Sequence, residues 1–89
     1  MVKHKKIFLE FYGASEYDTF LCIMPECRAI AVDIHHVDQK KMGGHKGKDR
    51  IENLAQVCRC CHDKADAYEI SKEYLFELIS EQMIKGLPE

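Results

Sequence analysis

The sequence has no tryptophan, and aromatic residues make up only 9% of its 89 residues. A chain of this length forms one domain, so residues 1–89 are expected to share a single, modest hydrophobic core. Domains of this size often need a disulfide or a bound metal in addition to the core. A long apolar run is also missing near the start, where the three apolar residues 7–9 follow a basic stretch and end at Glu10. We therefore expect no signal peptide and no membrane contact, and a protein of the cytoplasm.

The sequence holds five cysteines, an odd number that is unsuited to a disulfide framework. In a reducing cytoplasm, paired cysteines more often hold a metal. Cys58 and Cys61 have the C-x-x-C spacing with which two thiolates bind one tetrahedral zinc, and Cys22 and Cys27 form a second pair. We therefore expect these four thiolates to close a structural zinc site, with Cys60 as a spare thiol. The alternative is that the four cysteines are buried without a metal.

Three segments are typical of β-strands because they are rich in strand-forming residues and end at turn-forming ones: residues 5–13, 29–35 and 51–57. The last two are expected to form an antiparallel pair joined by a long loop over residues 37–50, which contains three glycines.

Two helices are expected in the C-terminal part of the chain. The first begins at Arg59, and the second covers Lys72–Lys85 with Ser71 as its N-cap. The second helix, within a C-terminal segment of residues 71–86, is followed by a glycine and a proline, and it has four apolar residues on one face: Leu75, Leu78, Ile79 and Met83.

Four of the five histidines fall between residues 31 and 62, and histidine is poorly suited to the core of a small domain. This stretch resembles the HNH nucleases, also called ββα-metal endonucleases, in four motifs that occur in order: DIHHV, GG, IENL and CRCCH. The likeness covers about residues 22–66 and is greatest with the zinc-knuckle subgroup, whose small stand-alone members occur in bacteriophages and bacteria. It implies an α+β protein with the small ββα-metal fold. In that fold an antiparallel hairpin with a long loop is followed by a helix, here stapled by a structural zinc and extended by a C-terminal helix.

The resemblance implies a role for each residue of the motif. His35 would bind a divalent cation, and His36 would be the general base that takes a proton from water. Asn53 would brace the loop that holds the base, and His62 would be a metal ligand from the helix. Alternatively, His35 and His36 are surface residues, Asn53 is a turn residue, and His62 only begins the helix beside the zinc site.

Two carboxylates are candidates for the same site. Asp66 lies four residues after His62, on the same helix face, and is a candidate third ligand for a magnesium-like ion unless it is simply exposed. Asp33 shares a strand face with His35 and would orient it. Because neighbours on a strand face opposite ways, His35 and His36 can serve one site only if the strand breaks at or just after His35.

Basic residues gather in the loop between the histidine pair and the cysteines. A local basic loop on a chain of net charge −2 suits contact with a few phosphates of a DNA backbone. The alternative is a solvated loop. The residues are Lys40, Lys41, Lys46, Lys48 and Arg50.

Taken with the resemblance, these residues predict a metal-dependent endonuclease that hydrolyses phosphodiester bonds in DNA, by nicking or with low sequence specificity. The catalytic cation would be Mg²⁺, Mn²⁺, Ni²⁺ or Zn²⁺, in addition to the structural Zn²⁺. The alternative is an inactive, zinc-stabilised module that binds nucleic acid or protein; a pure zinc-ribbon adaptor would leave the histidine pair unexplained. The expected location is the cytoplasm of a bacterial or phage-infected cell, and candidate partners are phage DNA-processing or packaging proteins. The oligomeric state is left open.

Overall fold

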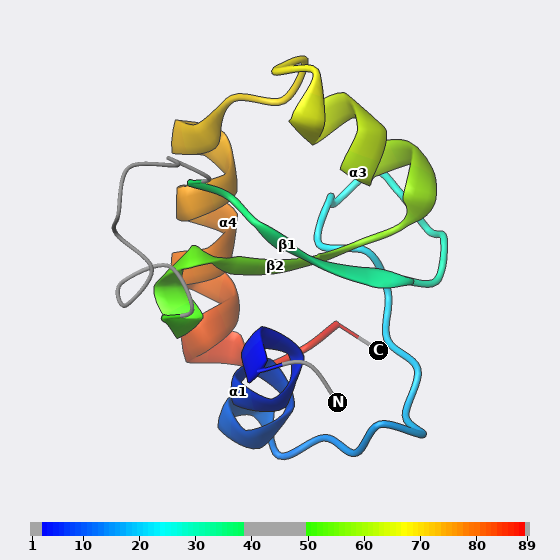
Figure 1. The fold of residues 1–89 in the computed structure, drawn as a ribbon, viewed down its shortest axis with the longest axis vertical. Helices are drawn as coiled ribbons and strands as arrows, with labels where there is room; N and C mark the ends of the chain where they lie inside the picture. Colours follow the sequence, from blue (N-terminus) through cyan, green and yellow to red (C-terminus); the bar gives the residue numbers. More distant parts are fainter. Residues whose placement is uncertain (1–2, 39–49, 89) are drawn as a thin grey trace.

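The fold is built around a two-stranded antiparallel sheet (Figure 1). A computed structural model describes residues 3–38 and 50–88, and within them β1 (Asp33–His36) pairs with β2 (Leu54–Val57). Opposite residues in the register include His35 with Ala55 and His36 with Leu54. With helices packed around this pair, the expected α+β class is confirmed.

Both strands are shorter than predicted. Ahead of β1, the chain forms an isolated bridge between Leu21 and Ile30, and ahead of β2, Ile51–Asn53 forms a 3-10 helix, η1. β1 continues through His36 and the chain bends at Val37. The break in the strand therefore falls after the histidine pair and not between its two members.

The predicted N-terminal strand is wrong. The segment is a helix, α1 (Lys3–Tyr12), which ends before Gly13, a residue with φ +67° in the left-handed region that favours glycine. Phe8 and Leu9 of this helix are buried against Leu54 of β2. Packing on the sheet thus outweighs the local preference of these apolar residues for a strand.

Both predicted helices are confirmed. α3 (Arg59–Asp66) begins after Cys58, whose sulfur accepts a hydrogen bond from the first turn. α4 (Lys72–Lys85) is capped by Ser71, whose Oγ also accepts from a backbone N–H of the first turn. The predicted apolar face of α4 is buried or half-buried in a cluster with Ala55 and Val57 of β2. None of the helices in the described residues combines the length and the apolar character needed to cross a membrane.

The sheet separates two clusters of buried apolar side chains. On one side, Ala55 and Val57 pack with side chains of α3 and α4 and with the buried cysteines. On the other side, Leu54 and Ile34 pack with α1. Because strand neighbours point to opposite faces, β2 contributes to both clusters and is buried along its whole length.

A pair of buried amides joins the elements around β2. Gln56 of β2 and Gln82 of α4 each donate from Nε2 to the other's Oε1, at 2.6 and 2.8 Å. Gln56 also donates to the carbonyl of Leu21, and Gln82 donates to the hydroxyl of Tyr12, both at 3.2 Å. Both buried amides are therefore hydrogen-bonded, and the pair ties α1 and α4 to the sheet.

The packing of α1 can be tested with two phenylalanines of the same helix. Phe8→Ala removes a side chain that is 0% exposed, whereas Phe11→Ala changes one that is 47% exposed. We expect Phe8→Ala to lower the free energy of unfolding by about 3 kcal/mol or more and Phe11→Ala by less than about 1 kcal/mol. Urea unfolding followed by circular dichroism measures both, and equal effects would contradict the description of α1 as part of the core.

Candidate metal centres

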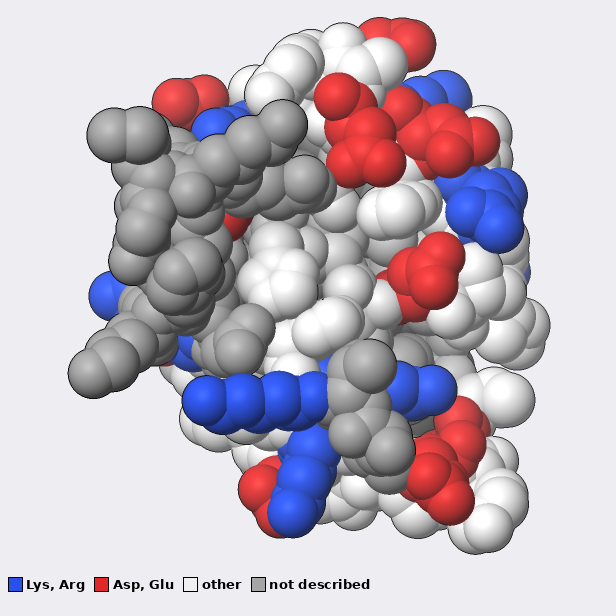
Figure 2. All heavy atoms as spheres, viewed as in Figure 1, with Lys and Arg blue, Asp and Glu red and all other residues white. Residues whose placement is uncertain are grey.

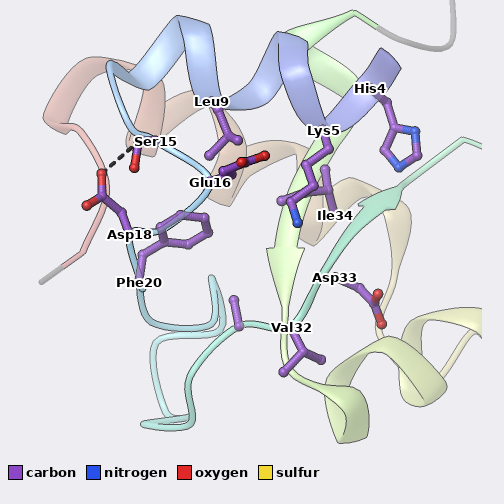
Figure 3. A pocket seen from close by; sticks show the side chains of 11 residues that line it. His4, Lys5, Leu9, Ser15, Glu16, Asp18, Phe20, Val32, Asp33 and Ile34 are labelled. Atoms are coloured by element: carbon purple, nitrogen blue, oxygen red, sulfur yellow. Dashed lines mark hydrogen bonds between the residues drawn. The ribbon is translucent and has the colours of Figure 1, made fainter. Parts of the chain in front are cut away.

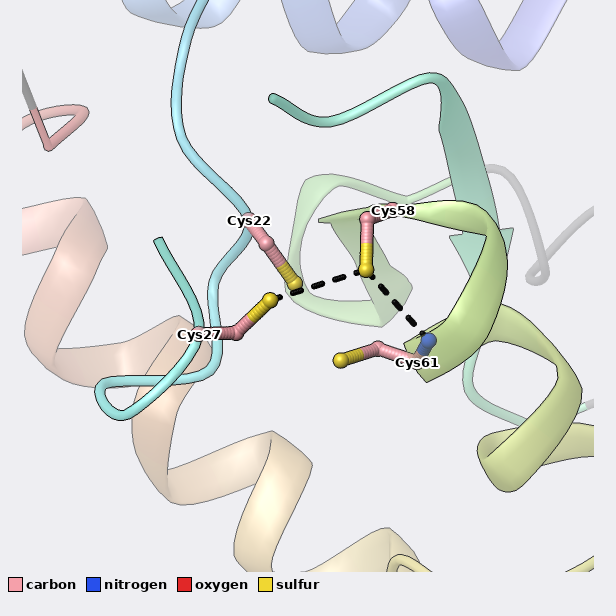
Figure 4. A group of neighbouring side chains, drawn as sticks. All are labelled: Cys22, Cys27, Cys58 and Cys61. Atoms are coloured by element: carbon pink, nitrogen blue, oxygen red, sulfur yellow. Dashed lines mark hydrogen bonds between the residues drawn. The ribbon is translucent and has the colours of Figure 1, made fainter. Parts of the chain in front are cut away.

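The two predicted cysteine pairs come together at one point (Figure 4). Cys22 and Cys27 flank a tight turn, while Cys58 and Cys61 lie at the start of α3. All four sulfur atoms lie within 4.8 Å of one another, and Cys27 Sγ is 3.6 Å from Cys58 Sγ. Cys60 is exposed on the same helix and is not a member of this group.

The chemistry of this donor set fits zinc. Four sulfurs bound to one tetrahedral zinc at about 2.3 Å are separated from one another by roughly 3.8 Å, close to the arrangement observed. The cysteines are free thiols rather than disulfides. The cluster can therefore form a zinc knuckle, in which one ion would join the turn at residues 22–27 to the start of α3.

The thiols differ in how readily they ionise. Burial opposes ionisation of Cys58, but hydrogen bonds from the Cys61 backbone N–H and from neighbouring thiols outweigh it and lower the pKa of Cys58 to about 7. Burial raises the pKa of Cys61, and the neighbouring thiols of Cys58 and Cys22 raise it further. Burial also raises the pKa of Cys22. A bound cation would have to displace the protons of Cys61 and Cys22.

His35, His62 and Asp66 form a second group of metal-binding type. The rings of His35 on β1 and His62 on α3 meet edge to face, with centroids 5.1 Å apart. Asp66, one turn after His62, places one carboxylate oxygen 3.9 Å from His35 Nδ1 and the other 3.8 Å from His62 Nε2. One donor atom from each residue lies within 4.8 Å of the other two.

This second donor set also fits a divalent cation. Separations of 3.8–3.9 Å are too long for hydrogen bonds, and they are a few tenths of an ångström longer than the roughly 3.3–3.6 Å between tetrahedral ligands that lie about 2.0–2.2 Å from one ion. Burial lowers the pKa of His35. His62 and His36 lower it further, and Asp66 partly opposes this. The ring is therefore neutral near pH 7, which is the form that binds metal. In addition, Nδ1 of His62 is buried without a hydrogen-bond partner, which is unfavourable unless an ion or water completes it.

Asp33 flanks this group from the start of β1. It shares a face of the strand with His35, as the alternation predicts, and its Oδ2 lies 3.9 Å from Nδ1 of His62. Its carboxylate is therefore placed beside the helix histidine, a neighbour that strand alternation alone does not predict.

His36 lies on the other face of the sheet. It is the register partner of Leu54, which faces α1, and its ring packs on His4 of α1 with centroids 4.4 Å apart. The structure thus brings His35, His62 and Asp66 together on one face of β1 and places His36 on the opposite face. His4 was not among the predicted site residues: it lies just ahead of the strand predicted over residues 5–13, and a strand at that place does not reveal its helical spacing of four residues from Phe8.

Asn53 holds the chain where it leaves β1. Its buried side chain accepts a hydrogen bond from the backbone N–H of Asp38 (2.8 Å) and donates to the carbonyl of the same residue (3.2 Å). The Val37 N–H donates to the backbone carbonyl of Asn53 (3.0 Å). The two residues that follow His36 are therefore fixed to the end of η1.

Most of the predicted backbone contacts lie outside the described residues. Arg50 is described and is exposed just ahead of η1. Figure 2 also shows basic side chains over α1, in the lower part of this face, whereas acidic side chains gather over α3. The residues outside the described part are Lys40, Lys41, Lys46 and Lys48.

A cavity of about 410 Å³ lies between α1 and the segment that leads into β1 (Figure 3). It is lined by four consecutive residues, 31–34, and by His4 and Lys5 on the opposite wall. Consecutive strand residues point to both faces, so the cavity follows the edge of β1 that is not paired with β2.

Comparison with known families agrees with this geometry. Residues 25–67 match the family model described as HNH endonuclease. This segment belongs to the HNH endonuclease family. It contains β1, β2, α3 and three of the four clustered cysteines, and its ββα arrangement confirms the fold expected from the resemblance.

The HNH segment covers residues 25–67, so α1, Cys22 and α4 lie outside it. Searches of curated proteins and of solved structures found no match to the chain. Membership of the HNH family implies a nucleic acid substrate and the use of a divalent metal.

Replacing one clustered thiol tests the zinc knuckle. Cys58→Ser should lower the zinc content of the purified protein and its melting temperature together, because a structural ion stabilises the folded chain. Cys60→Ser, two residues away and exposed, is the matched control and should change neither. Elemental analysis and thermal unfolding measure the two quantities, and full zinc content with an unchanged melting temperature in Cys58→Ser would remove this cysteine from the site.

Zinc affinity should also depend on pH. Because burial raises the pKa of Cys22 and Cys61, both thiols carry protons near pH 7 that zinc must displace. Affinity should therefore fall as the pH falls, by at least about 100-fold per pH unit, because at least these two protons are released. Competition with a chromophoric chelator between pH 8 and pH 6 measures the slope; an affinity independent of pH would show that the ion does not displace these protons.

Proposed function

We propose that the chain is a metal-dependent endonuclease that hydrolyses phosphodiester bonds in DNA. The observation that carries the proposal is the grouping of His35, His62 and Asp66 within 4.8 Å, inside a segment of the HNH family and beside a second histidine on the same strand. An inactive binding module would have no need to keep a complete set of these residues.

His36 is the proposed general base. Imidazole exchanges protons near neutral pH, so it can accept a proton from a water molecule that attacks phosphorus. The P–O3′ bond then breaks, and family resemblance implies products with a 5′-phosphate and a 3′-hydroxyl. Asn53 supports this step because it fixes the backbone of the residues that follow the base.

His35, His62 and Asp66 are the proposed ligands of the catalytic cation, which is Mg²⁺, Mn²⁺, Ni²⁺ or Zn²⁺. When bound, such an ion stabilises the negative charge that develops on the phosphate. Asp33, close to Nδ1 of His62, would keep the ring of that ligand in place. The four clustered thiols would hold the separate structural zinc.

The edge of β1 that faces away from β2 offers a way for one phosphate to reach both faces of the strand. His35 and His36 point to opposite faces, and a substrate at the edge would lie between them. The cavity along this edge supports such an approach because it is bordered by Asp33 on the cation side and by His4 on the side of His36. Arg50 and the loop lysines would contact the phosphate backbone, which carries no base information, so low sequence specificity follows.

The described residues of one copy hold one such site, which would therefore nick a duplex; cutting both strands would need a second copy or a second event. The resemblance to small stand-alone nucleases supports a role in phage or bacterial DNA processing in the cytoplasm. A DNA-packaging protein is the kind of partner such a nuclease would serve.

A supercoiled plasmid assay tests the proposal. The parent should convert the plasmid to the nicked form with at least one of Mg²⁺, Mn²⁺, Ni²⁺ and Zn²⁺. His36→Ala should reduce the rate by about 100-fold or more, because a positioned base contributes roughly 10²–10⁴-fold. Glu77→Ala, on the exposed face of α4, is the control.

Each outcome has a definite meaning once zinc content and melting temperature show that the variants are folded. Equal nicking by the parent and His36→Ala would remove His36 from the mechanism. Absence of nicking by the parent with all four ions, together with DNA binding in a mobility-shift assay, would favour the inactive binding module.

A further inference from the structure

The helix α1 reaches the proposed general base although it lies outside the HNH segment. The ring of His4 packs on the ring of His36, with centroids 4.4 Å apart and planes inclined by 53°. Both side chains are half-buried. The contact joins residues that are 32 positions apart, one on a helix and one on a strand.

The position of His4 is set by the hydrophobic core and not by a loose terminus. Phe8 follows His4 by one helical turn, so the two side chains share a face of α1. Phe8 is fully buried in the cluster that contains Leu54. Leu54 is in turn the register partner of His36 on the neighbouring strand, so the anchor of the helix lies directly beside the base.

The other side of His36 is held through the backbone. Asn53 fixes Asp38 with two hydrogen bonds, and Val37 donates to the carbonyl of Asn53. These bonds fix the main chain after His36 but do not fix the torsions of its side chain. A neighbouring ring does, because it occupies the space into which the imidazole would otherwise turn.

We propose that His4 is a positioning residue for the reaction: its ring packs against His36 and holds the imidazole in the orientation that accepts the proton of the attacking water. The inference rests on the proposed function of His36. His4 transfers no proton in this role, so an aromatic ring of similar size can replace it. The family segment would then depend on a residue from a helix that is not part of it.

The effect should appear in turnover rather than in substrate binding. A small misplacement of a reacting group can cost about 10²-fold in rate, whereas the proposed contacts with the DNA backbone come from Arg50 and the loop lysines. We expect His4→Ala to reduce kcat by about 10–100-fold with less than about a twofold change in KM. His4→Phe should recover most of kcat. Glu10→Ala, exposed on the same helix, should match the parent.

The experiment measures kcat and KM for nicking by these four proteins with the metal that supports the parent best. Thermal unfolding and zinc content serve as checks of the fold. A loss of kcat in His4→Ala that His4→Phe restores supports the proposal. Parental kcat in His4→Ala overturns it, and so does an equal loss in both variants, since that would show a requirement for the imidazole nitrogens.

A second measurement separates this inference from the proposed nuclease activity. Proton–carbon NMR of histidine-labelled protein reports the His36 ring directly, without substrate and without turnover. His4→Ala should shift and broaden the His36 ring signals, and His4→Phe should leave them sharp. If the parent cuts no DNA but these signals respond as expected, the proposed function fails while the contact stands. If the parent cuts and the signals do not respond, His4 does not position His36.

Discussion

The alternation of side chains along a sheet of only two strands is the constraint on which the rest of the structure depends. Each residue of β1 and β2 must point to one of two faces, and both faces are covered, one by α1 and the other by α3, while α4 reaches side chains of both. His35 and His36 are neighbours on β1 and so belong to different faces and to different groups of side chains. The placement of the two histidines follows from backbone geometry before any contact with a metal or a substrate is considered.

The two faces are held by different kinds of interaction. On the side of α1 the contacts are mainly apolar, through Phe8, Leu9 and Leu54. On the other side, the apolar cluster includes the four cysteines. Structural zinc sites contribute about 10–16 kcal/mol, which is comparable to the whole stability of a typical domain, about 5–15 kcal/mol. Occupancy of the zinc knuckle would therefore decide whether this face is formed.

The sequence predicts well those features whose cause is local. α4 has a capping serine, a regular apolar face and a terminal glycine, and the structure reproduces all three. The spacing of Cys58 and Cys61 fits one turn at the start of α3. α1 was predicted wrongly because the local preference of its apolar residues for a strand is outweighed by packing on Leu54, which is far away in the chain. For the same reason the contacts between His4 and His36, and between Asp33 and His62, could not be predicted: each requires the spatial arrangement of elements that no spacing rule relates.

The position of Cys22 has a consequence for how this domain could be moved between proteins. The HNH segment begins at residue 25, so it carries three of the clustered thiols and leaves the fourth behind. It also lacks α1 and α4, which cover Leu54 on one face and Val57 on the other. A fusion that transplants only the recognisable motif would expose both sides of β2 and break the cysteine set. The smallest portable unit is therefore larger than the motif and includes the helices at both ends.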